Sequence, residues 1–199
     1  MPRPVIALDA DGVLLDFNLA YAHVWGRAFG KRPHERDPRA YWPTDRWHVP
    51  ELAPAQWEHF RTHFDQGFWS AVPAIEGAVS ACHRLHKAGF DLVCVTALDL
   101  RYEAARLNNL RALGFPIERV LATGNSGTER SPKADAVNEL RPVAFVDDYL
   151  PYLRGVHAAI HTALILREPH GSPNAGSEMS LAKSMHADLA AFSHHWLAG

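Results

Sequence analysis

Acidic residues and one threonine stand at the ends of short apolar runs in this chain. Asp9 and Asp11 follow the run that begins the sequence, Thr96 ends a second run, and Asp147 and Asp148 end a third. Continuous apolar runs of this length are typical of strands that are covered on both faces of a parallel sheet. Because such sheets bind ligands beyond the carboxyl ends of their strands, these five residues are expected to meet at one edge.

Carboxylates gathered at one edge repel one another strongly unless a cation lies among them. Oxygen ligands without sulfur or imidazole nitrogen suit Mg²⁺, so Mg²⁺ is the predicted cofactor. Taken singly, each aspartate has a simpler interpretation, since aspartate after a strand often caps a helix or forms a turn. The pattern Asp9-x-Asp11-Gly12 repeats the placement of Asp147 and Asp148 on another strand, which favours the metal site.

The elements that must position these residues follow from the order of patterns along the chain. Apolar runs at 5–8, 92–95, 119–122, 143–146 and 162–166 alternate with segments of helical spacing. This alternation predicts an α/β fold, a three-layer α/β/α Rossmann-like parallel sheet with right-handed crossovers. The segments expected to be helical are 75–87, 100–113, a helix that begins with Ser131-Pro132 as N-cap and first residue, and a last helix over 179–191.

One connection is too long for a simple crossover and predicts an inserted subdomain. Residues 16–72 are expected to form a helical cap between the first and second strands, while 1–15 and 73–199 form the catalytic domain. The first cap helix carries Phe17 and other apolar residues on one face and ends at Gly30, and a second carries Trp57 and Phe60. A long loop is expected between them.

These motifs resemble those of the haloacid dehalogenase-like phosphohydrolase superfamily. Four segments carry the resemblance in the order expected of that superfamily, and they are Asp9-Ala-Asp-Gly-Val-Leu-Leu-Asp16, Val93-Cys-Val-Thr96, Lys133 at the start of a helix, and Phe145-Val-Asp147-Asp148. The resemblance implies a phosphatase whose helical cap closes over the site and chooses the substrate. The predicted insertion lies where that cap belongs, between the first and second motifs.

The resemblance also implies a role for each of the acidic residues. Asp9 is expected to attack phosphorus and form an aspartyl-phosphate. Asp11 is expected to protonate the leaving oxygen and then to activate water. Asp9, Asp147 and the backbone carbonyl of Asp11 are expected to hold Mg²⁺, with Asp148 as a further ligand or a neighbour of the ligands.

Phosphate binding is assigned by the same resemblance. Thr96 and the backbone amide of Ala97 are expected to hold phosphoryl oxygens. Lys133 is expected to neutralise the nucleophile and the transferring group. Taken alone, Lys133 has the alternative interpretation of a solvated helix residue.

A closer likeness is to the 5′-nucleotidase branch that acts on deoxyribonucleotides. The first motif followed by Phe17, and then Phe68-Trp69 with Pro73 and Glu76-Gly77-Ala78, resembles that branch. The resemblance implies that Phe17 lines a pocket for the base, while packing in the core of the cap is the other interpretation of this residue. The branch commonly has Ser-Pro after the threonine, whereas Ala97-Leu98 stands here.

Composition limits the partners. The chain has 199 residues and a formal net charge of −2, which gives no general basic field for a nucleic-acid polymer. A small phosphorylated metabolite is therefore the expected substrate. The first apolar run is too short for a membrane span or a secretion signal, so a cytoplasmic protein with no membrane partner is expected. A phosphomutase of the same superfamily and a non-catalytic phosphate-binding or interaction protein are the alternative functions.

Overall fold

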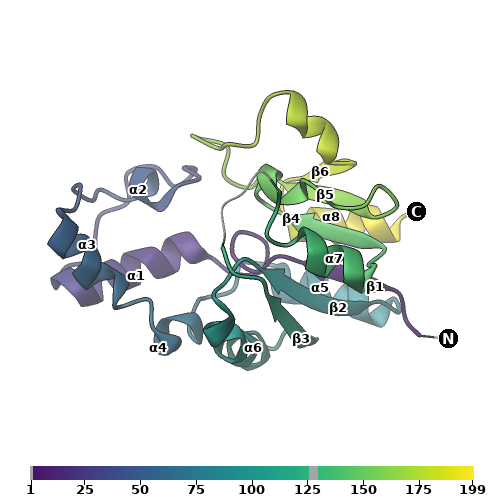
Figure 1. The fold of residues 1–199 in the computed structure, drawn as a ribbon, viewed down its shortest axis with the longest axis horizontal. Coiled ribbons are helices and arrows are strands. Elements are labelled where there is room, and N and C mark those ends of the chain that lie inside the picture. The colour runs from purple at the N-terminus through teal and green to yellow at the C-terminus, as the bar shows by residue number, and fades with distance from the viewer. Residues whose placement is uncertain (1, 126–129) are drawn as a thin grey trace.

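A computed structural model describes residues 2–125 and 130–199 and contains the predicted parallel sheet. Six strands lie in the order β3-β2-β1-β4-β5-β6, and every neighbouring pair is parallel. Figure 1 shows the sheet at one end of the molecule. The strands are β1 (Val5–Leu8), β2 (Asp91–Thr96), β3 (Ile117–Ala122), β4 (Ala144–Asp147), β5 (His161–Ile165) and β6 (Ser184–His186).

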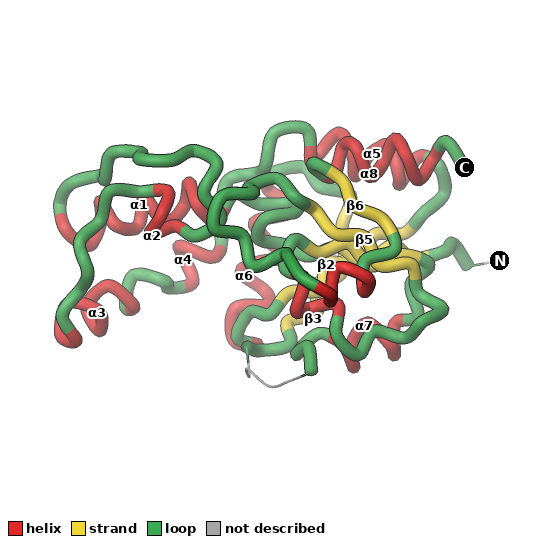
Figure 2. The backbone as a smooth tube through the Cα atoms, turned by 90° about the horizontal axis from the view of Figure 1, so that it is seen from above, coloured by secondary structure: helices red, strands yellow, loops and turns green. Residues whose placement is uncertain are grey.

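Alternate residues of β1 point into two separate apolar clusters, and this gives the three layers. Ile6 and Leu8 pack in the cluster that includes side chains of helices α5, α6 and α8. Ala7 packs in the cluster on the opposite face, which includes Val137 of α7. Figure 2 shows α5 and α8 together on one side of the strands and α7 on the other. The helices are α5 (Ala78–Lys87), α6 (Glu103–Ala112), α7 (Ala134–Leu140) and α8 (Leu189–Leu197), and the predicted three-layer α/β/α fold is confirmed.

Residues 16–72 leave the sheet after β1 and form four helices at the other end of the molecule (Figure 1). The carboxylate of Asp16 accepts a hydrogen bond from the backbone N–H of Leu19, which fixes the start of α1. Apolar and aromatic side chains hold the segment together, with Phe60 fully buried against Trp25. The helices are α1 (Phe17–Phe29), α2 (Pro43–Arg46), α3 (Pro54–Arg61) and α4 (Gln66–Trp69). We refer to residues 16–72 as the cap segment.

The structure differs from the sequence prediction in the cap segment, near the C-terminus and at the start of α7. The long loop expected between the first two cap helices contains the short helix α2 (Pro43–Arg46). The single helix expected over 179–191 is wrong, because the chain there forms a 3-10 turn, then β6, and then α8, which begins at Leu189. Asp188 causes the late start, since its carboxylate caps the N–H of Ala191 at 2.7 Å. Helix α7 begins at Ala134, after a turn, rather than at Pro132.

No helix among residues 2–125 and 130–199 has the length and apolar character that crossing a membrane requires.

Candidate functional site

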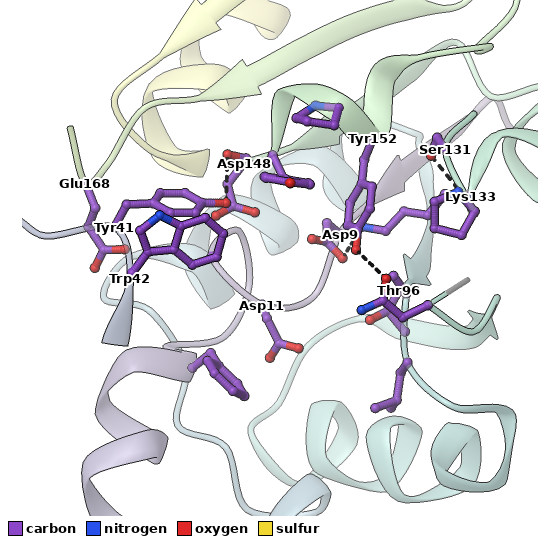
Figure 3. A pocket seen from close by; sticks show the side chains of 18 of the residues that line it. Asp9, Asp11, Tyr41, Trp42, Thr96, Ser131, Lys133, Asp148, Tyr152 and Glu168 are labelled. Carbon is purple, nitrogen blue, oxygen red and sulfur yellow. Dashed lines mark hydrogen bonds and ion pairs between the residues drawn. The ribbon is translucent and has the colours of Figure 1, made fainter. Parts of the chain in front are cut away.

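The acidic residues that follow β1 and β4 come together at the carboxyl edge of the sheet (Figure 3). Asp9, Asp147 and Asp148 each offer a carboxylate oxygen, and these oxygens lie within 4.8 Å of one another. Asp9 and Asp147 are buried, and Asp148 is partly exposed. The strand ends place these three residues as the sequence predicted, because β1 and β4 are direct neighbours.

Lys133 joins the acidic group from the opposite side. Its side chain is completely buried, and Nζ lies 2.6 Å from Oδ1 of Asp9 and 2.7 Å from Oδ2 of Asp147. The backbone N–H of Lys133 donates to the hydroxyl of Ser131, which fixes the turn before α7. The ring of Tyr152 lies 4.4 Å from Nζ and adds a cation–π contact. Burial lowers the pKa of Lys133, but the nearby carboxylates more than reverse this, so the ammonium form is retained.

A glycine makes room for Asp148. Gly12 has a backbone φ of +89°, a conformation that residues with a side chain rarely adopt. A Cβ atom added there would lie 2.1 Å from Oδ2 of Asp148. The first motif therefore needs glycine both for its turn and for the close approach of this carboxylate.

The acidic group fits a divalent cation by charge and by donor type. One ammonium balances one of the three carboxylates, which leaves two negative charges in a largely buried site. Burial raises the pKa of Asp147 to about 7, an effect that Lys133 opposes and Asp9 reinforces. The pKa of Asp148 is raised well above its usual range, first by burial and then by the charges of Asp147 and Asp9. Oxygen-only donors with this excess charge match Mg²⁺.

Mg²⁺ is expected to stabilise the protein more at pH 8 than at pH 5. The pKa of Asp147 in the folded protein, about 7, lies above its ordinary value. Between these two values the folded, metal-free chain binds a proton that the unfolded chain releases, so its free energy of unfolding falls as pH rises. Mg²⁺ needs the deprotonated carboxylates and offsets this fall. Urea unfolding with EDTA or Mg²⁺ at both pH values tests this, and equal Mg²⁺ effects at pH 5 and pH 8 would contradict it.

Replacing Lys133 with Met is expected to destabilise the metal-free protein. The change leaves Asp9 and Asp147 without their shared ammonium, and removing one partner of a buried ion pair typically costs about 3–5 kcal/mol. Added Mg²⁺ should recover more stability in Lys133→Met than in the parent. Urea unfolding in EDTA and in Mg²⁺ measures both effects. Lys87→Met, at an exposed end of α5, is the control and should behave as the parent.

Asp11 lies apart from the three clustered carboxylates. Its side chain points away from Asp9 in Figure 3 and binds Arg106 of α6, whose Nη2 lies 3.0 and 2.8 Å from the two oxygens of Asp11. Burial raises the pKa of Asp11, an effect that Arg106 opposes and Asp9 reinforces. The expectation that the backbone carbonyl of Asp11 binds the metal stays a prediction.

The remaining predicted residues line one cavity of about 640 Å³ together with the acidic residues. Thr96, at the end of β2, and Ala97 lie on its sheet side, beside Asp9 and Lys133. Phe17 lines the cavity from the cap segment. All the predicted site residues line this cavity except Asp147, which belongs to the acidic cluster but is fully buried behind Lys133.

Aromatic residues of the cap segment form much of the opposite wall. Tyr41 and Trp42 meet edge to face at 4.9 Å, and Trp42 is 42% exposed. Phe17 is stacked with Trp69 at 6.2 Å between ring centroids and also packs against the aromatic core of the cap segment. Both interpretations of Phe17 that the sequence left open therefore describe its position.

Several lining residues escaped the sequence analysis. Glu168 lies shortly after β5, and it accepts hydrogen bonds from Asn18 at 3.1 Å and Arg46 at 2.8 Å. It therefore ties the sheet to the cap segment. The hydroxyl of Tyr41 reaches the backbone oxygen of Asp148 at 3.5 Å. Tyr41 and Glu168 lie outside the four motifs, so only the fold brings them to the site.

Solved structures with the same fold include several hydrolases. A HAD-family hydrolase from Deinococcus radiodurans R1 with bound phosphate and sodium has 19% identity and a TM-score of 0.66, with 99% of this chain and 96% of that chain covered. A HAD hydrolase from Bacillus subtilis bound to magnesium has 16% identity and a TM-score of 0.61, with 98% and 99% covered. The L-2-haloacid dehalogenase from Xanthobacter autotrophicus has 11% identity and a TM-score of 0.57, with 99% of each covered. No curated protein sequence matches this chain.

The fold and the four motifs define a haloacid dehalogenase-like hydrolase, as the resemblance predicted. Residues 3–112 match the family described as "5′ nucleotidase, deoxy (Pyrimidine), cytosolic type C protein". This match spans more than half of the sequence, so the chain belongs to that family, and the nucleotidase branch predicted from Phe17 and the first motif is confirmed. The protein is accordingly a phosphoric monoester hydrolase.

Proposed function

We propose that this protein is a Mg²⁺-dependent phosphatase that removes the 5′-phosphate of a nucleotide through an aspartyl-phosphate on Asp9. One observation carries the proposal. A buried lysine contacts Asp9, which lines a cavity whose opposite wall is aromatic, and also contacts Asp147, which is buried behind it. The polar end suits a phosphate group, and the aromatic wall suits the flat face of a base.

In the first step an oxygen of Asp9 attacks phosphorus, and the bond from phosphorus to the ester oxygen breaks. The electron pair of that bond stays on the ester oxygen, which takes a proton from Asp11 and leaves as the alcohol. Burial raises the pKa of Asp11, which favours the protonated form that an acid role requires. The ammonium of Lys133 lies against Asp9 and reduces the repulsion between its carboxylate and the phosphate.

In the second step the Asp11 carboxylate takes a proton from water, and the water oxygen attacks phosphorus. The bond between phosphorus and Asp9 breaks, which restores the Asp9 carboxylate and releases inorganic phosphate. Asp9, Asp147 and Asp148 would hold Mg²⁺, which supplies positive charge that screens the carboxylate from the phosphate. Thr96 and the Ala97 amide are assigned to bind phosphoryl oxygens.

The cap segment, residues 16–72, is proposed to act as the subdomain that selects the substrate. The cap segment offers the substrate the aromatic faces of Phe17, Tyr41, Trp42 and Trp69. The family description names a deoxy, pyrimidine nucleotidase. A deoxyribonucleoside 5′-monophosphate is therefore the first substrate to test. The word "cytosolic" in the same description supports a cytoplasmic location.

A phosphate-release screen tests the proposed function. Deoxyribonucleotides, ribonucleotides, sugar phosphates and an aryl phosphate would be compared in Mg²⁺, in Ca²⁺ and in EDTA. Release from a nucleotide is expected in Mg²⁺ only, because Ca²⁺ tolerates bidentate carboxylates and more ligands and would occupy both oxygens of Asp9. Full turnover in EDTA would contradict the metal assignment. Isomerisation of a sugar phosphate without release of phosphate would identify a phosphomutase instead.

Replacing Phe17 with Ala is expected to change the ranking of substrates more than the need for Mg²⁺. The side chain lines the cavity from the cap segment and is not one of the carboxylates that would hold the metal. The ratio of kcat/KM between a nucleotide and a sugar phosphate is the measurement. Phe64→Ala is the matched control, because Phe64 packs against Phe17 at 6.3 Å in the cap core. An identical ranking for Phe17→Ala and the parent would remove Phe17 from the pocket.

A further inference from the structure

The largest fully buried side chain in the described part of the protein is that of an arginine, Arg106. It lies on α6, on the same helix face as Asn109 and Leu110, which are also buried. Its Nη2 lies within 3.0 Å of both oxygens of Asp11, and its guanidinium carbon lies 5.1 Å from the ring centroid of Trp69. Arg106 thus touches the proposed acid and base on one side and the cap segment on the other.

The ion pair with Asp11 satisfies only part of this guanidinium. Within residues 2–125 and 130–199, its Nε and Nη1 are buried and have no hydrogen-bond partner. Unpaired buried donors are costly, and a buried ion pair often contributes less to stability than apolar side chains of the same size. A buried arginine whose donors are only partly paired therefore needs an explanation other than packing, and a functional role is one.

The contact with Asp11 fixes the direction of that carboxylate. One nitrogen of Arg106 binds both oxygens, so the carboxylate is turned toward α6. Figure 3 shows that the Asp11 side chain points away from Asp9 and Lys133. In that direction Asp11 lines the same cavity as Phe17 and Trp69. This is the side on which a leaving group would lie if phosphorus were bound against Asp9.

Trp69 links the contact between Arg106 and Asp11 to the cap segment. It is the last residue of α4, its indole N–H donates to the backbone oxygen of Phe64 at 3.1 Å, and its ring stacks on Phe17. Helix α4 also packs against α6. The indole therefore rests on the cap aromatics and covers the guanidinium that holds Asp11.

We propose that Arg106 is a positioning residue, which holds the Asp11 carboxylate toward the leaving group and is itself held in place by Trp69 of the cap segment. The inference rests on the proposed function, because it assigns Arg106 a part in the proton transfer by Asp11. It adds that the cap segment acts on chemistry as well as on substrate choice. Misplacing a catalytic group by about 1 Å can cost on the order of 100-fold in rate.

Arg106→Met keeps an unbranched apolar stem on the buried face of α6 but removes the guanidinium and its contact with Asp11. With a nucleotide, kcat is expected to fall about 10- to 100-fold, while KM changes less than about threefold. With an aryl phosphate, whose leaving group needs no protonation, formation of the phosphoenzyme should keep the parental rate. Arg106→Lys, which retains one donor and the charge, should recover part of kcat. Arg111→Met is the matched control, since Arg111 lies on the same helix, is exposed and pairs with Glu118.

The double variant with Asp11→Asn separates positioning from general damage. If Arg106 acts through Asp11, Arg106→Met should cost little more in a protein that already lacks the Asp11 carboxylate. The same fold-loss in the parent and in Asp11→Asn would overturn the proposal. So would an unchanged kcat in Arg106→Met.

A crystal structure of Arg106→Met tests the positioning without any assay. The Asp11 carboxylate is expected to turn or to take more than one conformation, and a single unchanged direction would overturn the proposal. The screen of the parent protein tests the proposed function separately. If the parent released no phosphate from any monoester, the proposed function would fail, while the direction of Asp11 in the crystal would still decide whether Arg106 positions it.

Discussion

Asp9→Asn is expected to end phosphate release altogether. Asp9 is 5% exposed, and its Oδ1 already receives the ammonium of Lys133 at 2.6 Å and the backbone N–H of Ala10 at 2.7 Å. An amide of the same shape fits this place but has no anionic oxygen to attack phosphorus. Loss of an enzyme's nucleophile lowers kcat by a factor on the order of 10⁴ to 10⁶.

Intact-protein mass after a rapid acid quench gives a second readout of this prediction. The parent should carry one added phosphate during turnover, and Asp9→Asn should carry none. Asp91→Asn is the control, because Asp91 lies at the other end of the sheet with a side chain that is 50% exposed. A phosphate retained on Asp9→Asn would place the nucleophile at another residue and contradict the assignment.

The sheet and the acidic cluster could be predicted because both depend on local patterns. Each strand is a short apolar run, and each motif ends its strand, so neighbouring parallel strands bring the motifs together whatever the details of packing. Asp9 and Asp147 are the simplest case, since β1 and β4 pair directly. Lys133 needed the family resemblance, because nothing in its own surroundings in the sequence distinguishes it from a solvated lysine.

Contacts between distant segments could not be predicted in this way. Arg106 and Trp69 meet only because α4 packs on α6, and Glu168 reaches Asn18 across 150 positions of sequence. One signal was nevertheless present, since Arg106 occupies the apolar face of its helix together with Leu110. The helix predicted over 179–191 failed for a related reason. Residues 184–186, in the middle of that segment, form β6 and pair with the open edge of β5, and this pairing satisfies backbone groups that a helix would otherwise have satisfied internally.

Asp11→Asn is expected to fail differently from Asp9→Asn. The Asn side chain still offers an oxygen to Nη2 of Arg106, so the side chain should keep its place, and the loss then reports on the missing proton transfer. General acid–base catalysis typically contributes about 10²–10⁴-fold, and a fall of this size in the steady-state rate is expected with a nucleotide.

An aryl phosphate separates the two halves of the reaction in Asp11→Asn. Its leaving group departs without a proton, so Asp9 should still be phosphorylated, whereas hydrolysis still lacks the base that activates water. The phosphoenzyme is therefore expected to accumulate, and it should survive acid and be cleaved by hydroxylamine, as an acyl phosphate is. Added mass on Asp11→Asn together with its absence on Asp9→Asn would support both roles. A near-parental steady-state rate in Asp11→Asn would show instead that another group, or bulk water alone, carries the proton. The Asp11 carboxylate would then have no catalytic importance, and Arg106 would have no positioning role.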